Sequence, residues 1–215
     1  MSRAAVANTI ELPPLCVRAD VGSVDPERRT VDLVFSTGAA VERTDYWTGK
    51  RYIEKLSMDP KAVKLERLNA GGPLLDAHSS WSIQDQIGVV EPGTAKVVKG
   101  EARATVRFSA RDAVEAIWQD VRDKIIRSVS VGYRILRFEE EQGKDGALPI
   151  RTATLWEPYE ISLVPMPADF GAGMRNAAVQ MNPCELVMRQ VDAGPRVTDA
   201  DRTRRFQLAK ARGHI

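Results

Sequence analysis

The fold of this chain is decided by residues 127–167, whose sequence is RSVSVGYRILRFEEEQGKDGALPIRTATLWEPYEISLVPMP. The first part, residues 128–138, is rich in β-branched and aromatic residues and predicts a strand. A charged, glycine-containing loop is expected at residues 139–149. Residues 151–156 and 157–167 have β propensity again and end in prolines. The body of the protein is therefore expected to close with strands.

The segments that precede this stretch also predict β structure. Residues 30–37, TVDLVFST, alternate the apolar Val31, Leu33 and Phe35 with polar neighbours, which is the pattern of a half-buried strand. Residues 86–93 and 95–110 predict further strands, and Pro92-Gly93 marks the turn between them.

One helix is predicted between these strands, at residues 111–126, RDAVEAIWQDVRDKII. Ala113, Ile117, Val121 and Ile125 recur at intervals of four, with Val114 and Trp118 beside them, which favours an amphipathic helix of about four turns. Residues 38–70 have no clear pattern. The whole predicts an α+β domain dominated by antiparallel strands, most simply a small β-barrel with flanking helices.

Composition sets limits on the class of protein. The chain has 215 residues, of which 43% are apolar and 28% charged, with a formal charge of +2. These values are typical of a globular protein and exclude a disordered polyelectrolyte. No apolar run approaches the roughly 18–20 residues that a spanning helix needs, so no membrane association is expected. The opening MSRAAVANTIELPPL lacks the apolar core of a signal peptide, so export is not expected.

Charge divides the chain into two parts. From Met174 onward there are eight Arg or Lys and four acidic residues, a net +4. We therefore expect a domain over residues 1–172 and a basic, partly flexible C-terminal tail over residues 173–215. Only Arg204 and Arg205 are adjacent in this tail, which is too little positive charge to predict nucleic-acid binding.

Cysteine and histidine are scarce, with Cys16, Cys184, His78 and His214 making up both sets. Two cysteines give no disulfide framework, and a reducing compartment is expected. No spacing resembles a zinc site, and no glycine-rich phosphate loop is present, so neither metal nor cofactor is expected. Cys16 lies in a predicted strand, where a thiol is more often packed than reactive.

His78 is the first candidate for chemistry, because it follows the apolar pair Leu74-Leu75 and precedes a polar loop. Imidazole is the usual general base near neutral pH. A lone histidine is nevertheless more often an ordinary hydrogen-bonded residue. His214, next to the end of the basic tail, is expected to be exposed and inert.

Two further candidates lie in residues 127–167. Ser128 and Ser130 begin a predicted strand that continues with Gly132, whose lack of a side chain allows another group to approach closely. A serine hydroxyl attacks only when a base takes its proton, so it would need His78 nearby. Glu160 stands before the apolar run 161–164 and could orient His78, although Glu157 and Asp76 are alternatives.

Three short motifs in this order resemble the prohead (capsid maturation) serine proteases of tailed bacteriophages, which are related to herpesvirus assemblins. They are His78 ahead of Ile87-Gly88, the sequence from Val129 to Tyr133 around Ser130, and Glu160-x-Ser-Leu-Val-x-x-Pro-Ala. The resemblance covers roughly residues 10–172. It implies a herpesvirus-protease-like barrel with Ser130 as nucleophile, His78 as base and Glu160 as orienting acid.

The resemblance also implies a biological role. Such enzymes cleave scaffold and major capsid protein extensions, and often themselves, inside the assembling procapsid in the host cytoplasm. A homo-oligomer such as a dimer is expected. The mechanism also requires an oxyanion hole of backbone N–H groups, which the sequence does not place; loops rich in Gly and Arg, such as those with Arg134 or residues 171–175, are candidates. The alternatives are a non-catalytic assembly protein of the same fold and an esterase that uses the same three residues.

Overall fold

The computed structural model describes residues 7–12, 15–144, 146–165 and 182–188. These ranges contain twelve strands, two α-helices and one 3-10 helix. The strands are β1 (Ala7–Leu12), β2 (Leu15–Asp25), β3 (Thr30–Ser36), β4 (Val41–Thr44), β5 (Arg51–Leu56), β6 (Pro73–Asp76), β7 (Gln86–Val90), β8 (Lys96–Val98), β9 (Glu101–Phe108), β10 (Ser128–Glu141), β11 (Ile150–Leu163) and β12 (Asn182–Met188). The helices are α1 (Glu66–Asn69), η1 (Ile83–Asp85) and α2 (Asp112–Arg122). None of them is long and apolar enough to cross a membrane.

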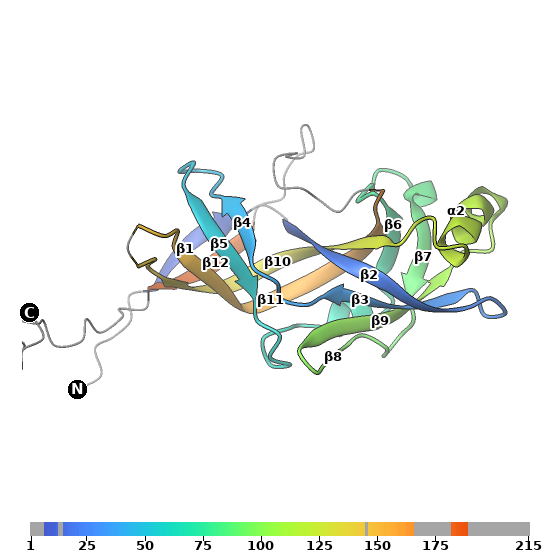
Figure 1. Ribbon diagram of the computed structural model, residues 1–215, viewed down its shortest axis with the longest axis horizontal. Helices are drawn as coiled ribbons and strands as arrows, with labels where there is room; N and C mark the ends of the chain where they lie inside the picture. Colours follow the sequence, from blue (N-terminus) through green and yellow to red (C-terminus); the bar gives the residue numbers. More distant parts are fainter. Residues whose placement is uncertain (1–6, 13–14, 145, 166–181, 189–215) are drawn as a thin grey trace, which may run out of the picture.

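The centre of the fold is an antiparallel ribbon of β10 and β11, each 14 residues long (Figure 1). It is built from the stretch 127–167, and a polar loop joins its two strands as the sequence predicts. The first half of β10 pairs with β2 and its second half with β12. In the same way, β11 pairs with β5 near its start and with β6 near its end. The ribbon therefore has two ends with different neighbours.

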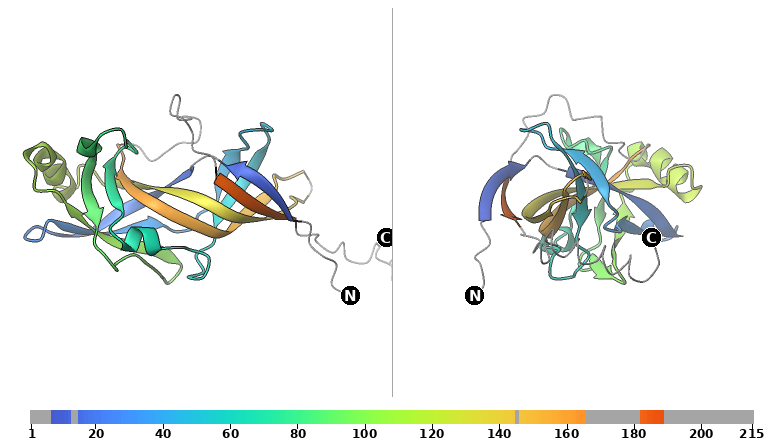
Figure 2. Two further views of the ribbon diagram at one scale, coloured as in Figure 1. Left: turned by 180° about the vertical axis from the view of Figure 1, so that it is seen from behind. Right: turned by 60° about the vertical axis from the view of Figure 1, so that its left-hand side comes forward.

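All described strands belong to one mixed sheet in which antiparallel pairs predominate. Its order is β1-β12-β10-β2-β3-β9-β7-β6-β11-β5-β4, with β8 on β9 and an additional pairing of β10 with β11. The mainly antiparallel β class is confirmed. The expected small barrel is not confirmed, because the outer halves of β10 and β11 carry β12-β1 and β5-β4 as an extension that ends, among the described strands, at β1 and β4. Figure 2 shows this extension at the end opposite α2.

Helix α2 is shorter than the sequence pattern suggests and buries only part of the predicted apolar face. It ends at Arg122, and its buried residues are Val114, Trp118 and Val121. All three belong to the predicted apolar face, whereas Ile125, predicted on the same face, lies beyond the helix with 70% of its surface exposed. The ring of Trp118 packs 5.1 Å from that of Phe108 on β9, so an aromatic contact helps to hold the helix against the sheet.

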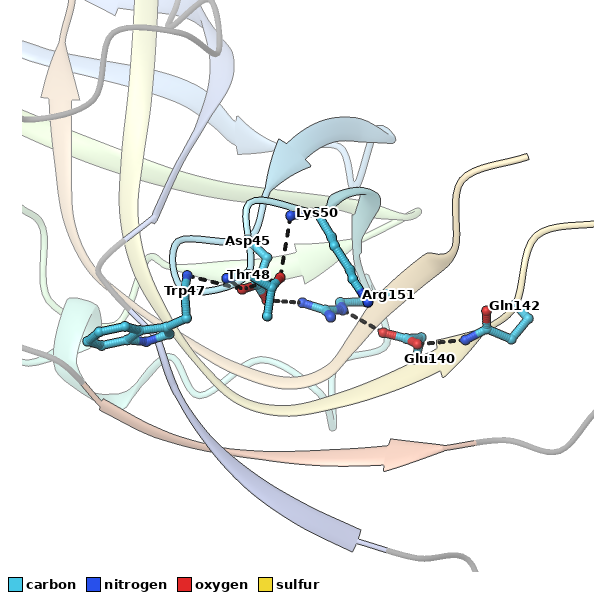
Figure 3. A network of polar contacts seen from close by, with 7 residues as sticks. All are labelled: Asp45, Trp47, Thr48, Lys50, Glu140, Gln142 and Arg151. Carbon is cyan, nitrogen blue, oxygen red and sulfur yellow. Dashed lines mark hydrogen bonds and ion pairs between the residues drawn. The ribbon is translucent and has the colours of Figure 1, made fainter. Parts of the chain in front are cut away.

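Residues 38–70, for which the sequence has no clear pattern, form the hairpin β4-β5 and the short helix α1. A polar network attaches the loop of this hairpin to the ribbon (Figure 3). Arg151 of β11 lies between two carboxylates, 2.9 Å from Asp45 and 2.7 Å from Glu140. Its guanidinium also lies 4.4 Å from the centroid of the Tyr52 ring. Asp45 in turn accepts hydrogen bonds from the backbone N–H groups of the following turn.

A second polar cluster, formed by Glu54, Arg43 and Tyr133, lies buried between the β4-β5 hairpin and the ribbon. The side chain of Glu54 on β5 is buried, with only 2% of its surface exposed. Its Oε1 accepts a hydrogen bond of 2.5 Å from the Tyr133 hydroxyl and one of 3.3 Å from Nε of Arg43. Burial raises the pKa of Glu54, and the neighbouring Arg43 opposes this rise.

Part of the segment expected as a tail belongs to the sheet. Residues 182–188 form β12, which pairs with β1 and with β10, and Cys184 is fully buried in the core. The rest of the predicted tail, including His214, lies outside the described residues, and the proposed division at residue 172 stays a prediction.

Candidate active site

Three adjacent strands bring the predicted site residues to one end of the ribbon. Ser130 of β10 is paired with Ser162 of β11, and Ser162 is paired with Leu75 of β6. His78 follows Leu75 by three residues, just after β6 ends at Asp76. Segments that are 32 to 84 residues apart in sequence therefore meet in consecutive strands.

The register of the ribbon decides which side chains share a face. Ser130 is opposite Ser162, and Gly132 is opposite Glu160, with the bulge coming only after Gly132. Alternate residues of a strand point to the same side, and directly paired residues do so too. Ser130, Ser162 and Glu160 consequently lie on one face.

Glu160 extends across the ribbon and over Gly132. A Cβ placed on Gly132 would be 2.2 Å from Oε1 of Glu160 and 2.9 Å from its Cδ. Real atoms do not approach so closely, so the carboxylate occupies the space that a side chain at this position would need. The sequence suggested that Gly132 allows a close approach, and the group that approaches is the carboxylate of Glu160.

His78 contacts this carboxylate directly. Its Nδ1 lies 2.7 Å from Oε1 of Glu160, and the exposed fractions of the two side chains are 20% and 5%. Because a carboxylate only accepts, Nδ1–H donates, and the lone pair of the neutral ring is then on Nε2. This tautomer is the one that a general base needs.

The backbone at His78 is held in an unfavourable conformation. Ala77 and His78 both have positive φ, +46° and +62°, which non-glycine residues rarely adopt. Three hydrogen bonds hold this turn: Ala77 N–H to the Leu163 carbonyl at 2.9 Å, Ser79 N–H to the Asp76 carbonyl at 2.8 Å, and His78 N–H to the Ser162 hydroxyl at 3.1 Å. The imidazole is thus mounted on a turn anchored to the end of β11.

Ser130 is fully buried, and its hydroxyl has no hydrogen-bond partner among the described residues. A buried polar atom without a partner is uncommon in proteins. It lies directly opposite Ser162 and on the face that carries Glu160, next to the residues that bind His78.

The alternatives considered for the acid are placed elsewhere. Glu157 forms an ion pair with Arg134, its neighbour across the ribbon, and Asp76 is exposed at the end of β6. The guanidinium of Arg134 is engaged in this ion pair, and residues 171–175, the other candidate for an oxyanion hole, lie outside the described residues.

Sequence reasoning missed the role of Ser162, which forms hydrogen bonds to both His78 and Glu160. Its hydroxyl donates to Oε2 of Glu160 at 2.6 Å while accepting from His78 N–H. The signal was available, because a serine two residues after Glu160 on a strand must share its face. Within the described residues, no group of three or more His, Cys, Asp or Glu is arranged to hold a metal ion.

A cavity of about 300 Å³ lies beside the loop that follows His78. Its lining includes Ile83, Gln86, Arg107 and Arg111, and does not include His78, Ser130 or Glu160. This cavity is therefore separate from the candidate active site.

Comparison with known proteins places the chain in a family. Residues 73–185, which include all three candidate residues, match the family model described as caudovirus prohead serine protease. Over 134 residues the chain is 37% identical to a protein named major capsid protein from the Halomonas phage phiHAP-1, covering 62% of the chain but only 21% of that relative. No solved structure matches. Because the family model covers more than half of its length, this chain belongs to the caudovirus prohead serine protease family.

Proposed function

We propose that this protein is a serine endopeptidase that matures phage procapsids, with Ser130 as nucleophile, His78 as general base and Glu160 as the acid that orients His78. The observation that carries the proposal is the 2.7 Å contact between Nδ1 of His78 and Glu160, above the strand that bears Ser130. A histidine held in this tautomer presents Nε2 for proton transfer.

The reaction follows from these positions. The Ser130 hydroxyl oxygen attacks the scissile carbonyl while Nε2 of His78 accepts its proton, and the same proton later passes to the leaving amine. Water then cleaves the acyl-enzyme with His78 again as base. Glu160 stabilises the imidazolium formed in each step. Since Ser130 is buried in the isolated chain, the proposal requires that substrate or a partner uncovers it.

The proposed substrates are the scaffold and the major capsid protein, with self-cleavage in addition, inside the procapsid in the host cytoplasm. The relative from phage phiHAP-1 supports a link to capsids, because a segment similar to this chain occurs within a protein named major capsid protein. A homo-oligomer, such as a dimer, is proposed as the working form.

Co-expression with the cognate capsid precursor tests this function, with mass spectrometry of the new termini. The wild-type chain is expected to cut the precursor at defined positions. Ser130→Ala is expected to abolish cutting, by at least about 10³-fold, while leaving the fold intact. Ser128→Ala is the matched control, because it removes the same hydroxyl two residues earlier on the same strand. Equal processing by Ser130→Ala and wild type would contradict the assignment.

A non-catalytic assembly protein of the same fold is the second candidate. It is favoured by the complete burial of Ser130, which in the isolated chain keeps the hydroxyl away from any peptide. Its signature is a wild-type chain that binds the precursor in a pull-down but leaves it uncut.

A further inference from the structure

We infer that Ser162 is a positioning residue that couples the backbone of His78 to the carboxylate of Glu160 and so keeps the imidazole in its working tautomer. This inference rests on the proposed function, because it assigns a role within the same site. Ser162 forms no hydrogen bond to the Ser130 hydroxyl, so its proposed effect runs through His78 and Glu160.

The Ser162 hydroxyl makes two contacts of opposite kind. It donates to Oε2 of Glu160 at 2.6 Å and accepts from the backbone N–H of His78 at 3.1 Å. The other carboxylate oxygen, Oε1, accepts from the His78 ring at 2.7 Å. Three hydrogen bonds therefore form a closed cycle that passes through the backbone of His78, its ring, the carboxylate and the hydroxyl.

The burial of Glu160 and Ser162 makes the hydrogen bond between them necessary. Ser162 has no exposed surface and Glu160 very little, so an unpaired carboxylate oxygen would not be solvated by water. With Oε2 held by Ser162 and the chain packed against Gly132, the carboxylate is fixed with Oε1 toward His78. Removing the hydroxyl frees the carboxylate to rotate away from the ring.

The backbone contact matters for a second reason. Ala77 and His78 both adopt positive φ, and such a turn persists only where its surroundings hold it. The Ser162 hydroxyl supplies one hydrogen bond to this turn and the Leu163 carbonyl supplies the next. Consecutive residues of β11 thus hold the two strained residues, and Ser162 alone links this support to the carboxylate.

The scarcity of histidine makes the inference testable by NMR. The chain has only His78 and His214, so ¹⁵N-histidine labelling in a His214→Gln background leaves one imidazole to observe. The wild-type ring is expected to be the Nδ1–H tautomer with a slowly exchanging, downfield Nδ1 proton. Ser162→Ala is expected to lose that proton signal and to give a mixture of tautomers.

Kinetics on the capsid precursor supply a second readout. Ser162→Ala is expected to lower kcat on the order of 10²-fold with KM nearly unchanged, as expected when a reacting group is misplaced. Ser162→Thr keeps a hydroxyl and is expected to retain the Nδ1 signal and most of kcat. The matched control is Ser79→Ala, which removes a hydroxyl next to His78 that is bonded to Asp85 instead.

The outcomes separate this inference from the proposed function. An unchanged Nδ1 signal and unchanged kcat in Ser162→Ala would overturn the inference. Should Ser162→Ala fail to fold, Ala77→Gly in the same chain is expected to restore folding by relieving the strained turn, but not the Nδ1 signal. If the double variant also fails to fold, Ser162 has a purely structural role, and the inference is overturned as well. An uncut precursor with wild-type enzyme contradicts the proposed function alone, because the NMR readout needs no activity.

Discussion

At the scale of single residues, the site depends on the close approach of Glu160 to Gly132. The carboxylate crosses from β11 to β10 and lies where a side chain at position 132 would be. The carboxylate can be buried there because His78 and Ser162 each form a hydrogen bond to one of its oxygens in place of water. The absence of a side chain at one position is therefore a condition for the geometry of three others.

Gly132→Ala is expected to destroy this geometry. The new methyl group would lie 2.2 Å from Oε1 of Glu160, so the carboxylate must leave Gly132 and, with it, His78. We expect precursor cleavage to fall at least as far as in Glu160→Gln, and the free energy of unfolding to fall by about 1–3 kcal/mol through overpacking. Urea denaturation and the cleavage assay measure the two effects.

A double-mutant cycle identifies the cause of that loss. In a Glu160→Ala background no carboxylate is left to collide with the new methyl, so Gly132→Ala is expected to cost little further stability. Equal costs in both backgrounds would show that the methyl group meets something other than Glu160.

At the scale of elements, the ribbon β10-β11 has a site at one end and a polar anchor at the other. The start of β11 carries Arg151, which lies between Asp45 and Glu140 (Figure 3). Burial raises the pKa of Asp45, but hydrogen bonds from Arg151 and Thr48 outweigh this and hold it below its ordinary value. In this anchor the Arg151 guanidinium is shared by the carboxylates of Asp45 and Glu140. These ion pairs attach the β4-β5 hairpin to the ribbon.

Arg151→Met is expected to lower the free energy of unfolding by on the order of 3 kcal/mol, because two poorly solvated carboxylates lose their common cation. The matched control is Arg51→Met, which breaks the exposed pair with Glu42 and is expected to change stability little or not at all. Denaturant titrations of both variants, compared at equal pH and salt, give the measurement. A similar small effect for both would mean that the anchor contributes no more than a surface pair.

At the scale of the whole molecule, Glu54 introduces a pH dependence of stability. Its pKa is raised above the ordinary value of 4.5 mainly by burial. The folded protein therefore keeps a proton on Glu54 at pH values where the unfolded chain has lost it. Stability from this group is fully present below the unfolded pKa and declines as the pH rises through the folded pKa.

Glu54→Gln is expected to remove this decline, because an amide does not titrate. The wild-type free energy of unfolding should fall with rising pH relative to the variant, by about 1.4 kcal/mol for each unit by which the pKa is raised. Above the folded pKa of Glu54 the variant also lacks a carboxylate partner for Arg43, which is expected to offset part of this difference. Urea denaturation at several pH values above 4.5 measures the slope, with the exposed Glu27→Gln as control. Parallel pH profiles for wild type and Glu54→Gln would contradict the raised pKa.

The strand pattern and the candidate residues could be predicted from the sequence, and for physical reasons. Alternation in residues 30–37 and the β-rich stretch 127–167 both correspond to strands, because side chains on a strand alternate between core and surface. Burial of Val114, Trp118 and Val121 agrees with the predicted apolar face of the helix, but the helix ends four residues earlier than predicted. The β4-β5 hairpin was not predicted from the sequence, because no local hydrophobic pattern marks it. Its attachment depends on Arg151, about 100 residues away in sequence.

The sequence by itself determined that this chain is mainly β, and it indicated His78, Ser130 and Glu160 as candidate site residues. Only the tertiary structure decided that Glu160, and not Glu157 or Asp76, binds His78, because strand register sets which residues face each other and no local pattern encodes register. It also decided the role of Gly132 and the bridge through Ser162. Those depend on contacts between β10, β11 and the turn after β6, which are neighbours in space and distant along the chain.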